Sequence, residues 1–404
     1  MPAVSDVVIC GAGIAGLSTG IMLARAGVRS AIVEIDPGVA VEGTGLTISA
    51  VGMRAIRDLG LAEAVNAHGA GYSEMVIGDA AGVELERVPY PAIAGHELPA
   101  AGGILRADFH RLLANVAEAE GVTLRYGAGV TGFEQVPDSV MVRLSDGGAL
   151  RTELLVGADG LRSRVRAMAF PGAPEPRYTG QRVWRVRIKR PVPGQDHGMW
   201  YGPICKAGIT PISAVEAYLF VVENSPDAGR PRREEWVQRL RHQLADFEGV
   251  VGWVRDTQLG ELSRIDCRPL YAVLVPLPWH RGRVLLVGDA LHATTPHLAS
   301  GAAIAIEDAV VLADLLAEEA ELETALRRFG QLRFERCRIV VESSLQLGEW
   351  EKRPGGGDAD PAGLIASSMA QLARPYRKER SDAPEAAVPA RARRDPEPPA
   401  SADG

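Results

Sequence analysis

A glycine-rich turn between a short apolar strand and a helix is the feature that most restricts how this chain can fold. Residues 4–10 are apolar and largely β-branched, and they lead directly into Gly-Ala-Gly-Ile-Ala-Gly at 11–16. A helical pattern follows up to Gly27, and the next apolar run predicts a second strand over 28–34. Strand, helix and strand in such a short stretch form a βαβ unit, which predicts the opening of a doubly wound parallel sheet.

The glycine spacing also predicts a ligand. Gly11 permits a tight turn, Gly13 lets the backbone approach a pyrophosphate, and Gly16 allows the helix to pack closely on the strand. Glu34 ends the second strand, where its carboxylate can accept hydrogen bonds from ribose hydroxyls. The pattern therefore predicts dinucleotide binding, against the alternative of a tight turn without a ligand, and does not by itself identify the dinucleotide.

Two later turns also follow buried strands. Val156 leads into Gly-Ala-Asp-Gly and a basic helix start, where Asp159 either serves a ligand or caps the helix. The apolar run 283–287 delivers Asp289 to its carboxyl end, the place where open α/β sheets bind ligands. Small residues at 299–303 then open a helix whose free N–H groups would face a flat, electron-rich ligand. An ordinary strand–loop–helix connection is the alternative for this last turn.

Composition places these turns in a large globular chain. Of its 404 residues, 46% are hydrophobic and 24% charged, which is typical of a folded protein with two or three domains. The net charge of -7 argues against a nucleic-acid partner, and no apolar run is long enough to span a bilayer. The four cysteines are scattered without metal-ligand spacing. We therefore expect a cytoplasmic protein with buried thiols and no metal site.

Two regions differ from the rest of the chain. Residues 181–223 alternate apolar and polar side chains and carry aromatics, as half-buried antiparallel strands do. Residues 352–404 contain eight of the 27 prolines and one aromatic residue, Tyr376, with nearly balanced charge. This composition predicts a solvated, disordered extension rather than a nucleic-acid arm.

Taken in order, the three glycine turns resemble the fingerprints of a known family. GAGIAG, GADG and GDALH are similar to the motifs of the single-component, class A FAD-dependent monooxygenases, which include aromatic hydroxylases. The resemblance covers residues 1–350 and implies an α/β fold. The implied fold comprises a Rossmann-like FAD-binding domain of the glutathione-reductase type, an inserted antiparallel β-sheet substrate domain and C-terminal helices. The implied boundaries are 1–72, 100–177 and 276–350 for the FAD-binding domain, 73–99 and 178–275 for the substrate-binding domain, and 351–404 for the tail.

The resemblance also implies roles for individual residues. Those expected to bind FAD are Gly11, Gly13, Ala15, Gly16 and Glu34 at the ADP half, Arg106 and Asp289 at the phosphate and ribityl chain, Asp159, Gly45 beside the isoalloxazine, and Gly301, Ala302 and Ala303 on its pyrimidine side. Pro296 is expected against the flavin ring, with His297 beside it. Tyr201 and Tyr218 of the insertion are candidates to orient a phenol, and Lys206 is a candidate to pair with a carboxylate or phenolate; packing in the core is the alternative for each.

The chain departs from the family pattern in two places. Ile35 follows Glu34 where many members carry arginine, so contacts on the adenosine side are expected to differ. After Pro296 the chain has His-Leu-Ala-Ser-Gly-Ala-Ala, where Gly-Gln-Gly-Ala-Asn is commoner. This second departure leaves the flavin contacts largely to the backbone.

The activity implied is an NAD(P)H-dependent hydroxylation of a small aromatic or heteroaromatic phenol through a flavin hydroperoxide. NADH or NADPH, O2 and the aromatic substrate are then the partners, with no nucleic acid and no membrane, and the sequence carries no signal for an oligomeric state. The alternatives are a related FAD-dependent epoxidase or reductase on the same scaffold, and a non-catalytic nucleotide-binding module. The absence of a Trp-x-Trp-x-Ile-Pro stretch disfavours a flavin halogenase, and the third motif disfavours an NAD-only dehydrogenase.

Overall fold

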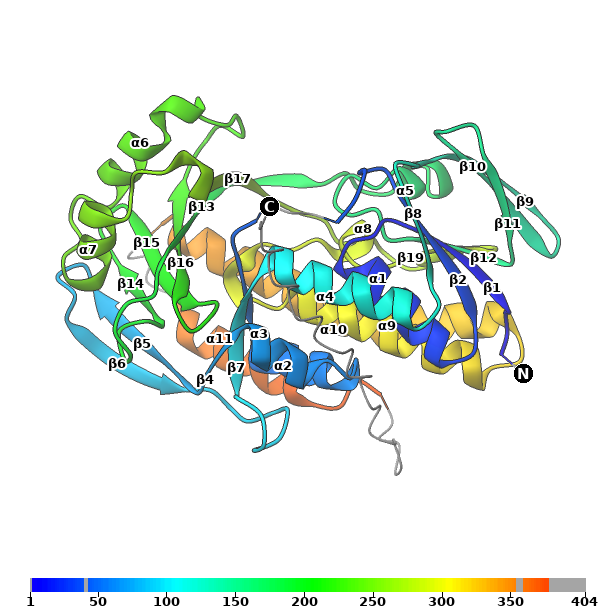
Figure 1. The fold of residues 1–404 in the computed structure, drawn as a ribbon, viewed down its shortest axis with the longest axis horizontal. Coiled ribbons are helices and arrows are strands. Elements are labelled where there is room, and N and C mark those ends of the chain that lie inside the picture. Colours follow the sequence, from blue (N-terminus) through cyan, green and yellow to red (C-terminus); the bar gives the residue numbers. More distant parts are fainter. Residues whose placement is uncertain (1, 40–42, 354–358, 378–404) are drawn as a thin grey trace, which may run out of the picture.

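The computed structural model describes residues 2–39, 43–353 and 359–377 (Figure 1). Its central sheet has the strand order β18-β19-β12-β1-β2-β8. The strands are β1 (Asp6–Cys10), β2 (Arg29–Glu34), β8 (Thr123–Tyr126), β12 (Leu154–Gly157), β18 (His280–Arg281) and β19 (Val284–Leu286). Pairing is parallel except between β18 and β19. The predicted doubly wound sheet is confirmed, and its central strands are apolar because both of their faces are covered.

Helices cover one face of this sheet and a small antiparallel sheet covers the other. Helix α1 (Ile14–Arg25) packs against α4 (Arg106–Ala119) and α9 (Gly301–Glu318), and α9 also contacts α2 (Ala50–Asp58). On the other face β9 (Val130–Val136), β10 (Ser139–Leu144) and β11 (Ala149–Thr152) form a meander whose strands contact β1 and β12. The shorter helices of this part are α3 (Ala62–His68), α5 (Arg164–Ala169), α8 (Asp289–His292) and the 3-10 turn η3 (Pro296–Leu298).

A seven-stranded sheet lies at the opposite end of the molecule (Figure 1), with the order β17-β13-β16-β15-β14-β5-β6. Its strands are β5 (Glu74–Asp79), β6 (Glu84–Pro89), β13 (Arg177–Lys189), β14 (Gly198–Tyr201), β15 (Cys205–Pro211), β16 (Glu216–Asn224) and β17 (Ile265–Ala272). The pairing of β5 with β14 brings residues 74–79 into the sheet of the later insertion. It supports our proposal that 73–99 and 178–275 form one substrate-binding domain.

Alternation along these strands sorts their side chains between two faces. Ala207, Leu219 and Val221 pack with Leu240 and Phe247 in a core beneath two helices. These helices are α6 (Trp236–Gln243) and α7 (Gly249–Thr257), flanked by the 3-10 turns η1 (Arg233–Glu235) and η2 (Leu262–Arg264). Because the side chains of a strand alternate, the intervening residues face the other way. A three-stranded sheet of β3 (Gly45–Ile48), β7 (Ala101–Leu105) and β4 (Ala70–Tyr72) lies on that side, and β7 contacts β15.

The prediction of a disordered tail over 351–404 is wrong for residues 359–377. Helix α10 (Leu322–Glu351) is followed by α11 (Pro361–Ala373), which packs against α10 and α2. Pro361 stands at the first turn of α11, where a missing N–H costs nothing. Leu372 and Tyr376 are buried, so apolar contacts outweigh the polar composition. Residues 378–404 of the predicted tail lie outside the described residues. Within the described part, no helix has the length and apolarity needed to cross a membrane.

Candidate functional site

The three predicted glycine turns lie side by side at the carboxyl edge of the parallel sheet. Register pairs Cys10 with Gly157 and Gly157 with Leu286, so all three turns leave the sheet at the same edge. Gly11 has φ +105°, and a Cβ there would lie 2.5 Å from the Ala158 carbonyl oxygen. The first and second motifs therefore touch through a position that only glycine can occupy.

The first turn has the shape of a pyrophosphate cradle. A Cβ on Gly16 would lie 1.9 Å from the Gly11 carbonyl oxygen, whereas a Cβ on Gly13 would meet nothing within 4 Å. Helix α1 begins directly after Gly13 without a side-chain cap, so its first N–H groups are available to a ligand. A close-packed Gly16 beside an open Gly13 is the arrangement that fits a dinucleotide.

Glu34 is held against this turn. One of its carboxylate oxygens accepts the Ala12 N–H at 2.7 Å, and the other accepts the Asp36 N–H at 3.0 Å. Each oxygen of a carboxylate can accept a further hydrogen bond. Glu34 is therefore fixed at the end of β2 with capacity left for ribose hydroxyls, although its contact with a cofactor stays a prediction.

The third turn abuts the first. Gly288 has φ +61°, and a Cβ there would lie 2.6 Å from the Ala15 Cβ, so the start of α8 lies against α1. Asp289 follows and is exposed, and its charge acts on the Arg106 guanidinium. Desolvation lowers the pKa of Arg106 and Asp289 raises it, yet the Arg106 side chain is exposed. The structure therefore places the exposed side chains of Arg106 and Asp289 close enough for their charges to interact.

Asp159 has partners within its own turn. Its carboxylate accepts the Ser163 hydroxyl at 2.5 Å and the backbone N–H groups of Arg164 and Val165 at 2.7 and 3.0 Å. These bonds satisfy the start of α5, which is the helix-capping alternative for this residue. Its predicted role toward FAD stays a prediction.

The loop that follows Pro296 leads into α9 without a side-chain cap. Pro296 opens η3, Ala299 has φ +48°, and Ser300 turns its hydroxyl to the Leu298 carbonyl. The first N–H groups of α9, at Gly301, Ala302 and Ala303, therefore have no side-chain acceptor. Ala299 occupies a left-handed conformation that costs a non-glycine residue about 1 kcal/mol, and it stands where the family commonly has glycine.

Tyr218 and Gly45 are in direct contact. A Cβ on Gly45 would lie 1.9 Å from Tyr218 Cδ1, so the tyrosine ring occupies the space that a side chain at this position would need. The Tyr218 hydroxyl is hydrogen-bonded to Thr47 Oγ1, which also lies 3.3 Å from Thr210 Oγ1. Two predicted residues are thus brought together with two threonines that the sequence did not single out. Tyr201 lies farther along the same sheet face and is 46% exposed.

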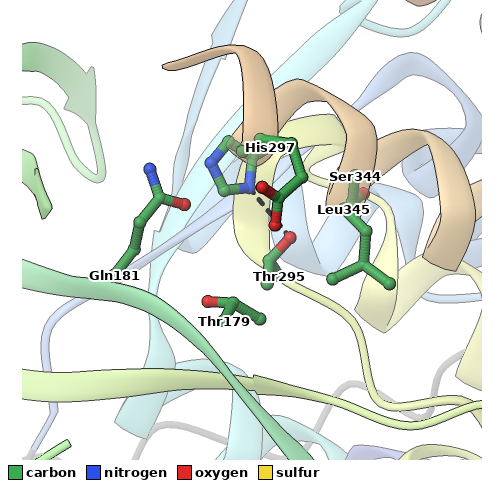
Figure 2. A pocket seen from close by; sticks show the side chains of 8 residues that line it. Thr179, Gln181, Thr295, His297, Ser344 and Leu345 are labelled. Carbon is green, nitrogen blue, oxygen red and sulfur yellow. Dashed lines mark hydrogen bonds between the residues drawn. The ribbon is translucent and has the colours of Figure 1, made fainter. Parts of the chain in front are cut away.

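His297 is enclosed rather than open to a substrate. Figure 2 shows its ring between Gln181 of β13 and Ser344 and Leu345 of α10, with Thr295 hydrogen-bonded to it. The bond from His297 Nδ1 to Thr295 Oγ1 is 2.8 Å. The crevice around it has about 140 Å³ of empty space and is too narrow for a water molecule. The catalytic role of His297 stays a prediction.

The second ring nitrogen of His297 leads to a buried ion pair. His297 Nε2 lies 3.1 Å from a Glu351 carboxylate oxygen, and the other Glu351 oxygen accepts the Lys206 ammonium. Desolvation and the Lys206 charge lower the pKa of His297, so its ring is neutral. Sequence reasoning missed Glu351, which it placed at the start of the tail; the available signal was Lys206, a lysine on a buried strand that requires an acidic partner.

A second buried network lies between α8, α9 and α10. His292 Nε2 and Arg333 Nε both bond Asp308, at 2.7 and 2.8 Å. His292, Asp308 and Cys337 present ligand atoms within 4.8 Å of one another, a spacing that suits a metal ion. Arg333 already supplies the positive charge to Asp308, so the cluster is a structural ion-pair network that fixes the helices behind the third turn.

Comparison with known proteins agrees with this geometry. Residues 4–340 match the FAD binding domain family. The chain is 34% identical to the aurachin C monooxygenase/isomerase of Stigmatella aurantiaca over 85% of this chain and 90% of that protein. It is 31% identical to 3-hydroxybenzoate 6-hydroxylase 1 of Aquipseudomonas alcaligenes over 88% and 91%. Klebsiella pneumoniae HpxO, solved with FAD and uric acid, superposes with a TM-score of 0.78 at 23% identity, covering 91% and 92%. The chain therefore belongs to the FAD binding domain family and, within it, to the class A FAD-dependent monooxygenases.

Proposed function

We propose that this protein uses NADH or NADPH and O2 to hydroxylate a small aromatic or heteroaromatic ring. The observation that carries the proposal is the convergence of three glycine turns, Arg106 and Asp289 at one sheet edge. The Tyr218 face of a second sheet adjoins this site through Gly45. The names of two relatives, a monooxygenase/isomerase and a 3-hydroxybenzoate hydroxylase, support the reaction type and the aromatic substrate.

The chain's own residues would hold FAD along this edge. The open backbone at Gly13 and the uncapped start of α1 suit the pyrophosphate. Asp289 and Arg106 suit the ribityl chain and phosphates, and the uncapped start of α9 offers N–H donors to an electron-rich ring. When bound, FAD supplies the redox and oxygen chemistry, and the protein supplies position and electrostatics.

The sheet face would bind and orient the substrate. The hydrogen bond with Thr47 and the contact with Gly45 fix Tyr218 in place, so its hydroxyl presents a preorganised group to a phenolic oxygen. The side chains of the sheet face cover this end of the site and exclude water. Water exclusion matters because it limits unproductive oxidation of the reductant.

The test is a panel of phenols and hydroxylated N-heterocycles supplied to the FAD-loaded protein with NADH or NADPH. Consumption of O2 and reductant is followed together with product formation. We expect at least one ring to accelerate reductant oxidation with one hydroxylated product formed per reductant consumed. Hydrogen peroxide as the sole oxygen product across the panel would contradict the proposal.

A further inference from the structure

The sheet face that adjoins the site carries Arg187, Arg268 and Lys206, three cations that each have an acidic partner of their own. Arg187 lies 3.3 Å from Glu216, and Arg268 lies 2.7 Å from Asp266. Asp266 is also directly opposite Arg185 in the register of β13 and β17. A substrate carboxylate approaching these arginines would compete with carboxylates that the chain itself supplies.

Lys206 is the most enclosed of these cations, and its partner is Glu351. The Lys206 side chain is 8% exposed and that of Glu351 is 23% exposed. Although burial opposes ionisation, the Lys206 charge and the hydrogen bond from His297 lower the pKa of Glu351 to about 2. Glu351 is therefore ionised throughout the physiological pH range and neutralises the lysine.

The ion pair lies between the substrate face and the Pro296 loop. Tyr201 is directly opposite Lys206 in the register of β14 and β15. Desolvation, and to a smaller extent the charge of Glu351, raise the pKa of the Tyr201 phenol. On the other side Glu351 bonds His297, the residue after Pro296. The pair thus occupies the end of the site formed by the sheet, the Pro296 loop and the last turn of α10.

This position has a consequence for charged substrates. A carboxylate that entered here would lose its water shell, and Lys206 would not repay that cost because it is already paired. Glu351 would also repel it, because like charges at short range inside a protein interact strongly. An uncharged ring of the same size meets neither penalty.

We propose that Glu351 is a specificity-determining residue that occupies Lys206 and restricts the site to aromatic substrates without a carboxylate at this end. The inference rests on the proposed function and narrows its substrate class. It separates this chain from its relative named for 3-hydroxybenzoate, whose substrate carries a carboxylate.

The test measures binding to the FAD-loaded protein by calorimetry with three ligands of matched shape. These are neutral 3-hydroxybenzamide, anionic 3-hydroxybenzoate and cationic 3-hydroxybenzylamine. The wild-type protein is expected to bind the amide at least tenfold more tightly than the benzoate. Glu351→Gln frees the Lys206 charge, and it is expected to shift the amide-to-benzoate ratio at least fivefold toward the benzoate.

A variant of opposite sign and two controls complete the design. Lys206→Gln leaves Glu351 unpaired and is expected to shift binding at least fivefold from the amide toward the benzylamine. The double variant Lys206→Gln/Glu351→Gln should restore the preference for the amide. Glu342→Gln removes an exposed charge from the same helix, where Glu342 pairs with Arg338, and should leave all ratios as in the wild type.

The inference is overturned if the binding ratios shift less than fivefold in both Glu351→Gln and Lys206→Gln. The same holds if neither variant gains binding of its charged ligand. If Glu351→Gln does not fold, the Lys206→Gln result alone decides it. Failure of the proposed function is distinguishable, because binding ratios are read without turnover. A protein that shows the predicted ratios but hydroxylates nothing refutes the activity and keeps the charge selection.

Discussion

A methyl group added at Gly13 would point into open space, whereas one added at Gly16 would collide with the Gly11 carbonyl. Both glycines belong to one motif, and only the structure separates their tasks. Gly16 serves the packing of α1 on the sheet, and Gly13 keeps a surface clear for a ligand. Because only Gly16 is needed for packing, a substitution at Gly13 tests whether a ligand approaches the backbone there without a large change in protein stability.

We expect Gly16→Ala to lower the free energy of unfolding by about 2–3 kcal/mol, because backbone atoms surround the new methyl group. Gly13→Ala should stay within about 1 kcal/mol of the wild-type apoprotein and should weaken FAD binding tenfold or more. Urea unfolding of the apoprotein and titration of flavin fluorescence measure the two quantities. Wild-type FAD affinity in Gly13→Ala would show that the cofactor does not approach this backbone.

Single residues were predictable from sequence where a motif fixes the backbone. The positions of Gly11, Gly16 and Asp289 follow from strand–turn–helix spacing, because parallel strands deliver their carboxyl ends to one edge. Lys206 indicated that an acidic partner was needed, but Glu351 could not be identified as that partner, nor Thr47 as the partner of Tyr218, since these pairs lie far apart in the sequence and on different elements. Spacing along a chain carries no information about such contacts.

At the scale of elements, the junction of β4, β14 and β15 contains a buried histidine with a pH consequence. His197 stacks on Tyr72 with 3.7 Å between ring centroids, and its Nε2 lies 3.1 Å from the Tyr90 hydroxyl. Its Nδ1 lies 3.2 Å from the Ile209 carbonyl oxygen. Desolvation lowers the pKa of His197 to about 4, so the ring is neutral in the folded protein.

Stability should therefore fall as the pH drops from 6.5 toward 4. In that window the unfolded chain binds a proton at this histidine and the folded chain does not, so the folded state loses about 1.4 kcal/mol per pH unit. His197→Asn keeps a donor for the Ile209 carbonyl and should remove that part of the slope. Urea unfolding at several pH values measures it.

The matched control is His242→Asn on α6, where the side chain is exposed. Its pH dependence should equal that of the wild type. Identical slopes in His197→Asn and the wild type would contradict the depressed pKa. Other histidines contribute equally to all three proteins, so the difference between slopes isolates His197.

Elements with a clear period were predictable, and those within mixed regions were not. The strand predicted over 28–34 forms as Arg29–Glu34, and the helical pattern that ends at Gly27 forms the helix Ile14–Arg25. Helices α6 and α7 interrupt an insertion that was expected to be rich in strands. The apolar residues of these helices could be interpreted only once the sheet that they cover was known. Leu240 and Phe247 pack against the side chains of β15 and β16.

At the scale of the whole molecule, Arg54 joins three distant segments. Its guanidinium donates to the carbonyls of Leu372 and Ala373 at 2.7 Å each and lies 3.4 Å from Glu307. Helix α11 is thereby tied to α2 and α9. The carbonyls at the end of α11, which lack partners within the helix, are satisfied by a cation, as the helix dipole favours.

Replacing Arg54 with alanine should release α11. We expect amide hydrogen exchange across 361–373 to accelerate at least tenfold and the free energy of unfolding to fall by about 3 kcal/mol, because buried partners lose their donor. Exchange followed by mass spectrometry gives the regional answer. Arg29→Ala, which removes an arginine with 81% of its side chain exposed, should change neither quantity. Unaltered exchange in α11 would show that Arg54 does not hold this helix in place.

The overall architecture was predictable because three motifs fix one sheet edge and the alternating middle region fixes a second sheet. The packing of residues 359–377 was not predictable. Proline and charge content describe the average solvation of a segment and do not show whether another part of the protein can bury it. Leu372 and Tyr376 are buried where the C-terminal segment packs against α2 and α10. Local composition is therefore a poor guide wherever a few apolar side chains pack against helices that are distant in the sequence.

The interleaving of the two sheets bears on how the protein is made. The first glycine turn leads into α1, which packs on Gly288 and on α9, and β5 at 74–79 pairs with β14 at 198–201, which is translated much later. The core beneath α6 and α7 needs the chain only as far as residue 267, whereas the core around the parallel sheet needs the chain as far as residue 376. Cofactor capture is then a late event in biosynthesis, and prematurely terminated chains expose unpaired apolar strands to proteases and chaperones.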